Sequence, residues 1–211
     1  MSPLFTRLRS WLTFDAGPSV ECLRQRFVAL DLETTGLDPR RDTIVSLAAI
    51  PFVGGVPAQG YVTLVDPGRA IPPQSTAIHG LTDAMVRGAP PLGRVLREAE
   101  PVFADAVLVG HNVGFDVAVL TRGRRACRLP PLRNPALDTA RLAAGLHPEW
   151  GDFSLERIAE RLGVEVVARH TAAGDALTAG RIFVALLPEL EGRRLRTVSE
   201  LHWLQRRALI R

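Results

Sequence analysis

The alternation of apolar and polar residues along the chain predicts a mixed α/β domain. Residues 27–33 form an apolar run that ends in an acidic pair, which is typical of a buried strand. Residues 43–53 and 60–65 predict two further strands, with a Gly-Gly hairpin turn at 54–55 between them. An antiparallel start followed by alternating helices and strands favours a mixed central sheet flanked by helices.

Helical spacing of apolar residues dominates the rest of the chain. It predicts helices at residues 91–103, from 113 onward, and at 139–146, 154–162 and 171–187, with short strands at 106–110 and 136–138. The helix at 171–187 is rich in small residues, including Gly174 and Gly180. We therefore expect its backbone to lie close to the first strand.

Amphipathic helical patterns also occur at both ends of the chain. One precedes the first strand, and the other follows a capping-box signature made by Thr197 and Glu200. These patterns predict an N-terminal helical extension at 1–25, a core domain at 26–187 and a C-terminal helical extension at 188–211. The two extensions either pack on the core or form a surface for a partner or for self-association.

The composition is that of an ordinary globular protein, with 46% hydrophobic and 23% charged residues. No apolar stretch approaches the length of about 18 residues that a membrane-spanning helix needs. The two cysteines, Cys22 and Cys127, show neither metal-type spacing nor a disulfide framework. We therefore expect no membrane association and a reducing, cytoplasmic location.

The charge balance is compatible with a nucleic-acid partner. The net charge is +4, and all 26 basic residues are arginine, whose guanidinium binds phosphate in a bidentate manner. A preference for arginine codons explains the same bias. Five arginines and no acid lie between Arg122 and Arg133, which is either a solvated face or a surface that follows a phosphate backbone.

Four carboxylates and one histidine are the strongest candidates for chemistry. Asp31 and Glu33 are separated by one residue of a strand, so their side chains point to the same side. Hard oxygen ligands in this arrangement suit Mg²⁺ or Mn²⁺ bound together with a substrate phosphate. Asp116 follows a Gly-His-Asn motif, and His170 precedes Asp175 by five residues. Because five residues of helix rotate by about 140°, we expect His170 to lie in the loop that enters the helix of Asp175.

These motifs, in this order, resemble a known family. They read Asp-Leu-Glu-Thr-Thr-Gly from Asp31, Ile-His-Gly-Leu-Thr from Ile78, Gly-His-Asn-Val-Gly-Phe-Asp up to Asp116, and His-Thr-Ala-Ala-Gly-Asp from His170. The set is similar to the DEDDh branch of the 3′–5′ exonucleases, the DnaQ-like family of the bacterial DNA polymerase III proofreading subunit. The resemblance covers about residues 26–187. It implies a ribonuclease H-like fold and the release of nucleoside 5′-monophosphates from a 3′ end.

The resemblance also implies a role for each of the five side chains. Asp31 would bridge two Mg²⁺ or Mn²⁺ ions, Glu33 and Asp175 would complete the shell of one ion, and Asp116 would hold the other, partly through water. His170 would be the general base that deprotonates the attacking water.

Residues beside the acids predict a substrate pocket, made of Thr34, Thr35, Gly36, Leu37, Ile78, His79, Asn112 and Phe115. We expect the backbone N–H groups of the first three to grip the terminal nucleotide and Leu37 to wedge against a base. In similar enzymes the Ile-His-Gly segment lies over the terminal sugar and base. A structural hydrogen bond for His79, and a place in the core for Phe115, are the alternatives.

The first hypothesis is thus a metal-dependent 3′–5′ exonuclease that acts on DNA. The alternatives are an enzyme that trims RNA, a non-catalytic module that binds nucleic acid or a polymerase, and a phosphohydrolase of small nucleotides. The sequence favours a free-standing enzyme over a polymerase subunit, with a homodimer through the terminal helices as one arrangement.

Overall fold

The computed structural model of the protein describes residues 21, 24 and 26–208. The predicted N-terminal helix and Cys22 lie outside the described residues. Along the chain the elements are β1 (Arg26–Thr34), β2 (Ile44–Val53), β3 (Val56–Pro57), β4 (Tyr61–Leu64), α2 (Pro73–His79), α3 (Asp83–Val86), α4 (Leu92–Phe103), β5 (Leu108–Gly110), α5 (Gly114–Ala126), β6 (Ala136–Asp138), α6 (Thr139–Leu146), a 3₁₀ turn (Pro148–Trp150), α7 (Leu155–Leu162), α8 (Ala172–Gly192) and α9 (Val198–Arg207).

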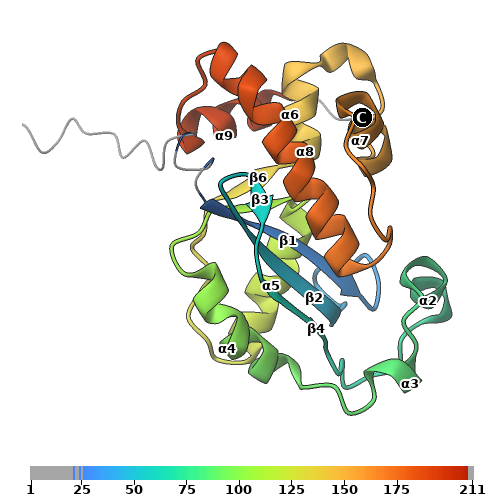
Figure 1. Ribbon diagram of the computed structural model, residues 1–211. Helices are drawn as coiled ribbons and strands as arrows, with labels where there is room; N and C mark the ends of the chain where they lie inside the picture. The colour runs from blue at the N-terminus through green and yellow to red at the C-terminus, as the bar shows by residue number, and fades with distance from the viewer. Residues whose placement is uncertain (1–20, 22–23, 25, 209–211) are drawn as a thin grey trace, which may run out of the picture.

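The strands form one mixed sheet with β1 inside it (Figure 1). β1 pairs with β2 in antiparallel register from Arg26 opposite Val53 to Thr34 opposite Ile44, and it pairs with β5 in parallel. β6 continues the parallel part at one edge. On the other side, β3 and β4 both pair with β2. The mixed α/β architecture predicted from the sequence is confirmed.

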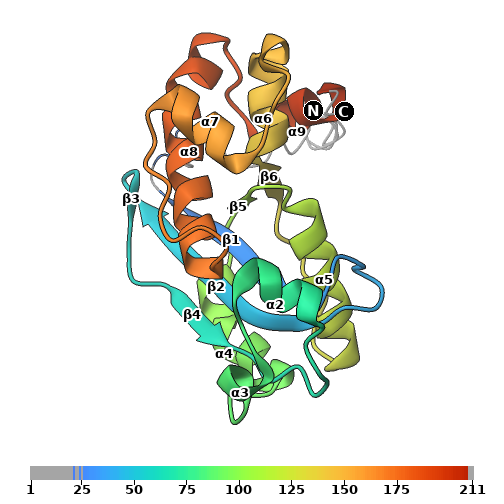
Figure 2. The same ribbon diagram turned by 90° about the vertical axis from the view of Figure 1, so that its right-hand side faces the viewer.

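Two layers of helices cover the sheet, and β1 is buried on both faces (Figures 1 and 2). Phe27 and Ala29 belong to the core shared with α6, α7, α8 and α9. Val28 and Leu30 belong to the core shared with α4 and α5. Since side chains alternate along a strand, Asp31 and Glu33 continue the first series and emerge on the side of α8.

Small residues allow α8 to lie directly on the sheet. A Cβ added to Gly180 would lie 2.3 Å from a ring carbon of Phe52, and Phe52 stacks on Phe27 with ring centroids 4.9 Å apart. Helix α8 also lies against β1, so the close approach to the first strand expected from its small residues is confirmed. Close packing at Gly180 sets how near α8, and with it the first turn of this helix, lies to the sheet.

Several elements differ from the prediction. α8 extends to Gly192 rather than to residue 187, through Pro188, because Leu190 near its end is fully buried. The short helices α2 and α3 and the two-residue strand β3 were not predicted. The Gly54-Gly55 turn leads from β2 into β3 rather than directly into the next long strand.

The C-terminal extension packs on the core, as one of the two alternatives requires. Thr197 and Glu200 form the predicted capping box at the start of α9. Leu201, Leu204 and Ala208 are buried in the core that α9 shares with α6. Among the described residues, no helix combines the length and the apolar character needed to cross a bilayer.

Candidate active site

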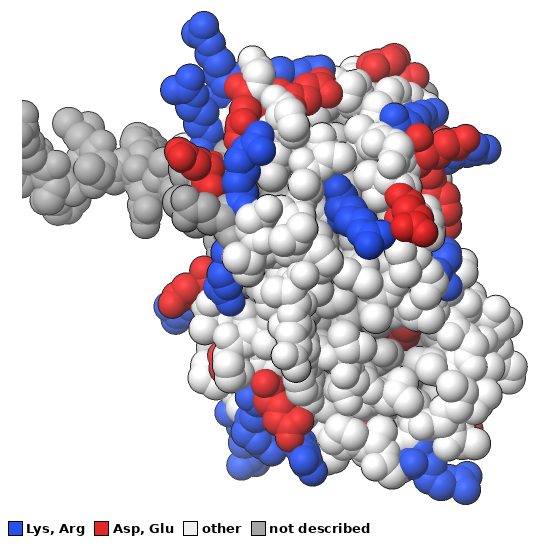
Figure 3. Space-filling model, in the orientation of Figure 1, with Lys and Arg blue, Asp and Glu red and all other residues white. Residues whose placement is uncertain are grey.

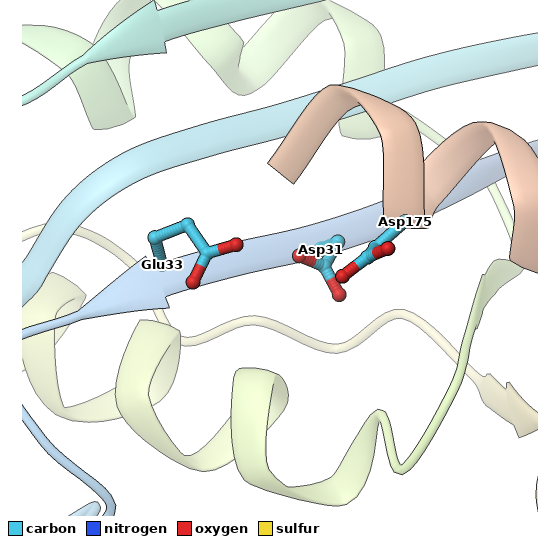
Figure 4. Close-up of side chains that lie close together, drawn as sticks. All are labelled: Asp31, Glu33 and Asp175. Atoms are coloured by element: carbon cyan, nitrogen blue, oxygen red, sulfur yellow. The ribbon is translucent and has the colours of Figure 1, made fainter. Parts of the chain in front are cut away.

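Three carboxylates from two elements converge at one point of the molecule (Figure 4). Asp31 and Glu33 project from β1, and Asp175 projects from the first turn of α8. One oxygen from each of the three lies within 4.8 Å of the others. Asp175 follows Glu33 by 142 positions in the sequence, and the fold thus brings their carboxylates to the spacing of ligands around one cation.

Asp116 lies beside this cluster on the neighbouring helix. It occupies the first turn of α5, is buried, and accepts a hydrogen bond through Oδ1 from the backbone N–H of Leu32 at 3.0 Å. Leu32 is the residue between the two acids of β1, so this bond fixes Asp116 against the acidic end of the strand.

A fifth carboxylate, Asp138, was not predicted as part of the site. It is buried at the end of β6, caps α6 by accepting from Ala140 N at 3.0 Å, and receives the N–H of Asn112 at 3.2 Å. Burial is the main cause that raises the pKa of Asp116, and the charge of Asp138 adds to it. The signal for it in the sequence is the same as for Asp31, an acid that follows an apolar strand.

Burial and mutual repulsion raise the pKa values of the clustered acids. Burial is the main cause for Asp31, whose pKa lies well above its ordinary value, and the charges of Asp116, Asp175 and Glu33 add to it. The pKa of Glu33 is raised to about 7, first by burial and then by Asp175. Such crowding of negative charge is unfavourable unless a cation compensates it.

The residues present fit a divalent cation. The donor set consists of carboxylate oxygens, which Mg²⁺ and Mn²⁺ prefer. Among the described side chains, Asp175 Oδ1 is the buried polar atom that has no hydrogen-bond partner. A buried oxygen that is left unpaired costs free energy, and a metal ligand bond would satisfy it.

Arg169 is a positive group in direct contact with the cluster. Its Nη1 pairs with Asp175 Oδ2, and its Nε pairs with Glu156 Oε1 of α7. Arg169 Nη1 also lies 3.3 Å from Nδ1 of His170. No local pattern in the sequence points to Arg169 or Glu156, because their contact joins a loop to a separate helix.

His170 lies in the loop before α8, as we expected. Its backbone φ is 61° and its side chain is exposed, while Thr171 caps the helix by accepting from Gly174 N at 3.1 Å. The loop therefore holds the imidazole at the rim of the acidic cluster rather than inside it.

The turn after β1 is anchored to α2. Ser75 donates its hydroxyl to the carbonyl of Thr35 at 2.8 Å, and Nε2 of His79 lies 3.3 Å from the carbonyl of Thr34. The backbone N–H of Leu81 donates to Nδ1 of His79 at 3.0 Å, so both ring nitrogens have partners within the protein. This favours the structural alternative for His79, and its contact with a substrate stays a prediction.

The predicted grip by backbone N–H groups is wrong at one of its three positions. The N–H of Thr35 donates to the carbonyl of Thr43 at 2.9 Å and is not free for a ligand. A Cβ at Gly36 would lie 2.5 Å from Oδ2 of Asp42, so a larger residue there would displace that carboxylate. Beside this turn, the apolar side chains of Leu37 and Ile78 are 80% and 53% exposed.

The remaining predicted pocket residues have different surroundings. Asn112 is exposed, with φ of 56°. Phe115 packs against the core on the α5 side of the sheet, which was the alternative explanation for it. The neighbouring His111, which is outside the predicted set, contacts Oγ1 of Thr139 through Nδ1 at 3.1 Å, and burial lowers its pKa to about 4, so that it is neutral at physiological pH.

The arginine run does not form one uniform surface. Arg122 donates to the carbonyls of Pro39 and Asp42, and thus holds the loop after β1. Arg124 is 2% exposed and pairs with Glu100 at 2.6 Å. In the space-filling view, one small acidic area lies recessed among uncharged residues, whereas most other acidic and basic side chains lie together near the margins of the face shown (Figure 3).

The model of a family described as exonuclease matches residues 28–183. The chain belongs to the exonuclease family. It is 43% identical over 176 residues to a DNA polymerase III subunit epsilon-like protein of Rhodobacter capsulatus, a match that covers 81% of this chain and 25% of that protein. It is 37% identical to the DNA polymerase III subunit epsilon of Aquifex aeolicus, over 78% of this chain and 81% of the relative. These findings confirm the resemblance to the proofreading subunit.

Solved exonuclease structures share the fold. Exonuclease X in complex with 5′ overhanging duplex DNA matches with a TM-score of 0.64 and 26% identity, over 86% of this chain and 99% of that one. Escherichia coli exonuclease I in complex with a dT13 oligonucleotide matches with a TM-score of 0.69 and 21% identity, over 81% of this chain and 43% of that one. The ribonuclease H-like sheet predicted from the sequence is thus confirmed for this exonuclease domain.

Proposed function

We propose that this exonuclease is a divalent-metal-dependent 3′–5′ enzyme that removes nucleoside 5′-monophosphates from the 3′ end of DNA. The observation that carries the proposal is the convergence of Asp31, Glu33 and Asp175 within 4.8 Å, next to the buried Asp116. Oxygen ligands in such number, with raised pKa values, belong to a site built to hold cations.

The carboxylates would hold two Mg²⁺ or Mn²⁺ ions. Asp31, Glu33 and Asp175 would share one of them, with Asp31 as the bridge, and Asp116 would reach the second. Bound cations of this kind stabilise negative charge on the attacking and leaving oxygens of a phosphodiester. The backbone N–H of Leu32 donates to Oδ1 of Asp116 and holds this carboxylate in place. Oδ2 of Asp116 takes no part in that bond and would be the oxygen that reaches the ion.

His170 would accept the proton of the attacking water. Imidazole is the side chain best suited to accept a proton near neutrality. The exposed position of His170 on a loop at the rim of the cluster lets its ring approach a bound phosphate without rearrangement of the core.

The apolar surface beside the acids would receive the terminal nucleotide. Leu37 and Ile78 are the exposed apolar side chains on the two segments that meet at the end of β1. Burying them against a sugar and base would remove apolar surface from water, while backbone N–H groups of Thr34 and Gly36 and the side chain of Asn112 would supply polar contacts.

DNA is favoured as the substrate because the relatives are named as DNA polymerase III subunits and one matched structure contains duplex DNA. The chain spans a quarter of the Rhodobacter capsulatus relative but most of the Aquifex aeolicus one. Association with a polymerase is therefore proposed at the level of the family, and a homodimer stays a prediction.

The decisive assay follows the release of labelled monophosphate from a single-stranded DNA 3′ end, with RNA and a free nucleotide as comparison substrates. Asp175→Asn should lose at least about a hundredfold in rate, since it removes a ligand of the charge-stabilising cation. Asp105→Asn is the matched control, because Asp105 is exposed and its φ of 53° suits asparagine. Equal rates for the two variants would refute the proposal, and release from RNA alone would reassign the substrate.

The base assignment has its own test. His170→Ala should lose about two to four powers of ten in rate at neutral pH, the usual contribution of a general base. Since the side chain is exposed, the melting temperature and Mn²⁺ affinity of the variant should stay close to those of the unsubstituted protein. Full activity of His170→Ala with Mn²⁺ bound would remove His170 from the mechanism.

A further inference from the structure

Arg169 places a positive charge next to the clustered carboxylates. It contacts Asp175 of the cluster directly and is anchored to Glu156 on α7, and its charge offsets part of the rise that burial and neighbouring acids cause in the pKa values of Asp31 and Glu33. Its side chain is 32% exposed, so it reaches the acids from the solvent side.

The same guanidinium engages the predicted base. Arg169 Nη1 lies 3.3 Å from Nδ1 of His170, and a guanidinium can only donate hydrogen bonds. Nδ1 of His170 is therefore the acceptor, and the neutral ring carries its proton on Nε2. One side chain thus contacts both a predicted metal ligand and the predicted proton acceptor.

The contacts of Asp175 show what a metal ion would have to change. Oδ2 is paired with Arg169, while Oδ1 is buried without a partner. A dication that takes Asp175 as a ligand would meet the positive charge of Arg169 at the same carboxylate. Like charges at that distance repel strongly where water is partly excluded.

We propose that Arg169 is a positioning residue that serves as the resident counter-cation of the cluster and leaves Asp175 when a divalent ion binds, while Glu156 retains it. This inference rests on the proposed function, because it presumes that the carboxylates hold the ion. Arg169 stabilises the metal-free acids, competes with the ion, and on release also frees Nδ1 of His170. Glu156 gives the displaced guanidinium a partner, which makes the exchange less costly.

The first test is the affinity for Mn²⁺, measured by calorimetry on the full chain at constant pH. A charge close to a carboxylate changes its ionisation by roughly one to three powers of ten, and partial exposure places Arg169 at the lower end. Arg169→Gln should therefore bind Mn²⁺ about tenfold more tightly than the unsubstituted protein. Its melting temperature should fall in EDTA and recover with Mn²⁺. Arg157→Gln, which removes an exposed charge from α7, is the matched control and should leave the affinity unchanged.

The second test separates an action through Arg169 from a simple charge effect. Glu156→Gln should weaken Mn²⁺ binding about threefold to tenfold, because Asp175 is then the remaining carboxylate partner of the guanidinium. In the Arg169→Gln background, the same Glu156→Gln change should have little effect. Equal weakening in both backgrounds would mean that Glu156 acts only by its own charge, and would overturn the exchange mechanism.

The outcomes for the two proposals are distinct. If the unsubstituted protein binds no Mn²⁺, the proposed metal-dependent function fails, and the role of Arg169 fails with it. If it binds Mn²⁺ but Arg169→Gln binds with equal or lower affinity, the carboxylate site stands. Arg169 is then a structural brace rather than a displaceable counter-cation.

Discussion

Removal of one negative charge from the cluster should stabilise the metal-free protein, although the change is at a predicted functional residue. Glu33→Gln replaces the carboxylate by a neutral group of nearly the same shape. The pKa of Glu33 is raised from 4.5 to about 7, so the folded protein holds this proton more tightly than the unfolded chain does. Stability contributed by the protonated form is present at low pH and is lost as the pH rises from about 4.5 to about 7.

The magnitude follows from this difference in pKa. Each pKa unit corresponds to about 1.4 kcal/mol, which gives an upper limit of about 3 kcal/mol for Glu33 above pH 7. Glu33 is half-buried, and screening by water reduces the expected value to about 1–2 kcal/mol. In a domain of this size, such a gain raises the melting temperature by roughly 2–8 °C.

The assay is urea unfolding in EDTA at pH 5 and at pH 8. Glu33→Gln should exceed the unsubstituted protein only slightly at pH 5 and by about 1–2 kcal/mol at pH 8. Glu165→Gln is the control, because the side chain of Glu165 is 82% exposed and pairs only at 3.6 Å with Arg181. A stability difference between Glu33→Gln and the unsubstituted protein that is the same at both pH values would refute the electrostatic reasoning.

Two further predictions concern the scaffold. Gly180→Ala should destabilise the protein by about 1–3 kcal/mol in urea unfolding, since its Cβ would lie 2.3 Å from the Phe52 ring, whereas Gly192→Ala on the same helix meets nothing within 4 Å and should be nearly neutral. Thr197→Ala should cost about 0.5–2 kcal/mol through loss of the capping box of α9, and Thr197→Ser, which keeps the hydroxyl, should recover most of it. A neutral Gly180→Ala, or a Thr197→Ser as unstable as Thr197→Ala, would contradict these expectations.

The sequence predicted the long elements because their side chains repeat with a clear period. β1 and α8 have apolar or small residues at nearly every position that faces the core. The acids Asp31, Glu33 and Asp175 are conspicuous because they interrupt that pattern. The short helix α2 could not be predicted in this way, since Ser75 and His79 are its buried residues and neither is apolar. Helix α8 continues past Pro188 because the burial of Leu190 outweighs the local signal for a helix end.

In the candidate site, too, the residues with a local sequence pattern could be predicted, and the contacts between distant segments could not. The four predicted acids were recognisable because each belongs to a local motif with characteristic neighbours. The contact of Arg169 with Glu156 and Asp175 was not, because it depends on where the loop before α8 passes the start of α7. Asp138 had a local signal, an acid after an apolar strand, but its importance comes from its position beside Asn112 and Asp116 in space.

The attachment of α2 makes this segment exchangeable as a unit. Its two anchoring side chains, Ser75 and His79, belong to the helix itself, and both reach backbone carbonyls at the end of β1. A backbone carbonyl is present whatever residue occupies position 34 or 35. A helix from a relative that carries serine and histidine at the matching positions would therefore form the same two contacts. The surface that carries Ile78, which we propose receives the terminal nucleotide, can therefore vary while the acidic strand beside it keeps its sequence.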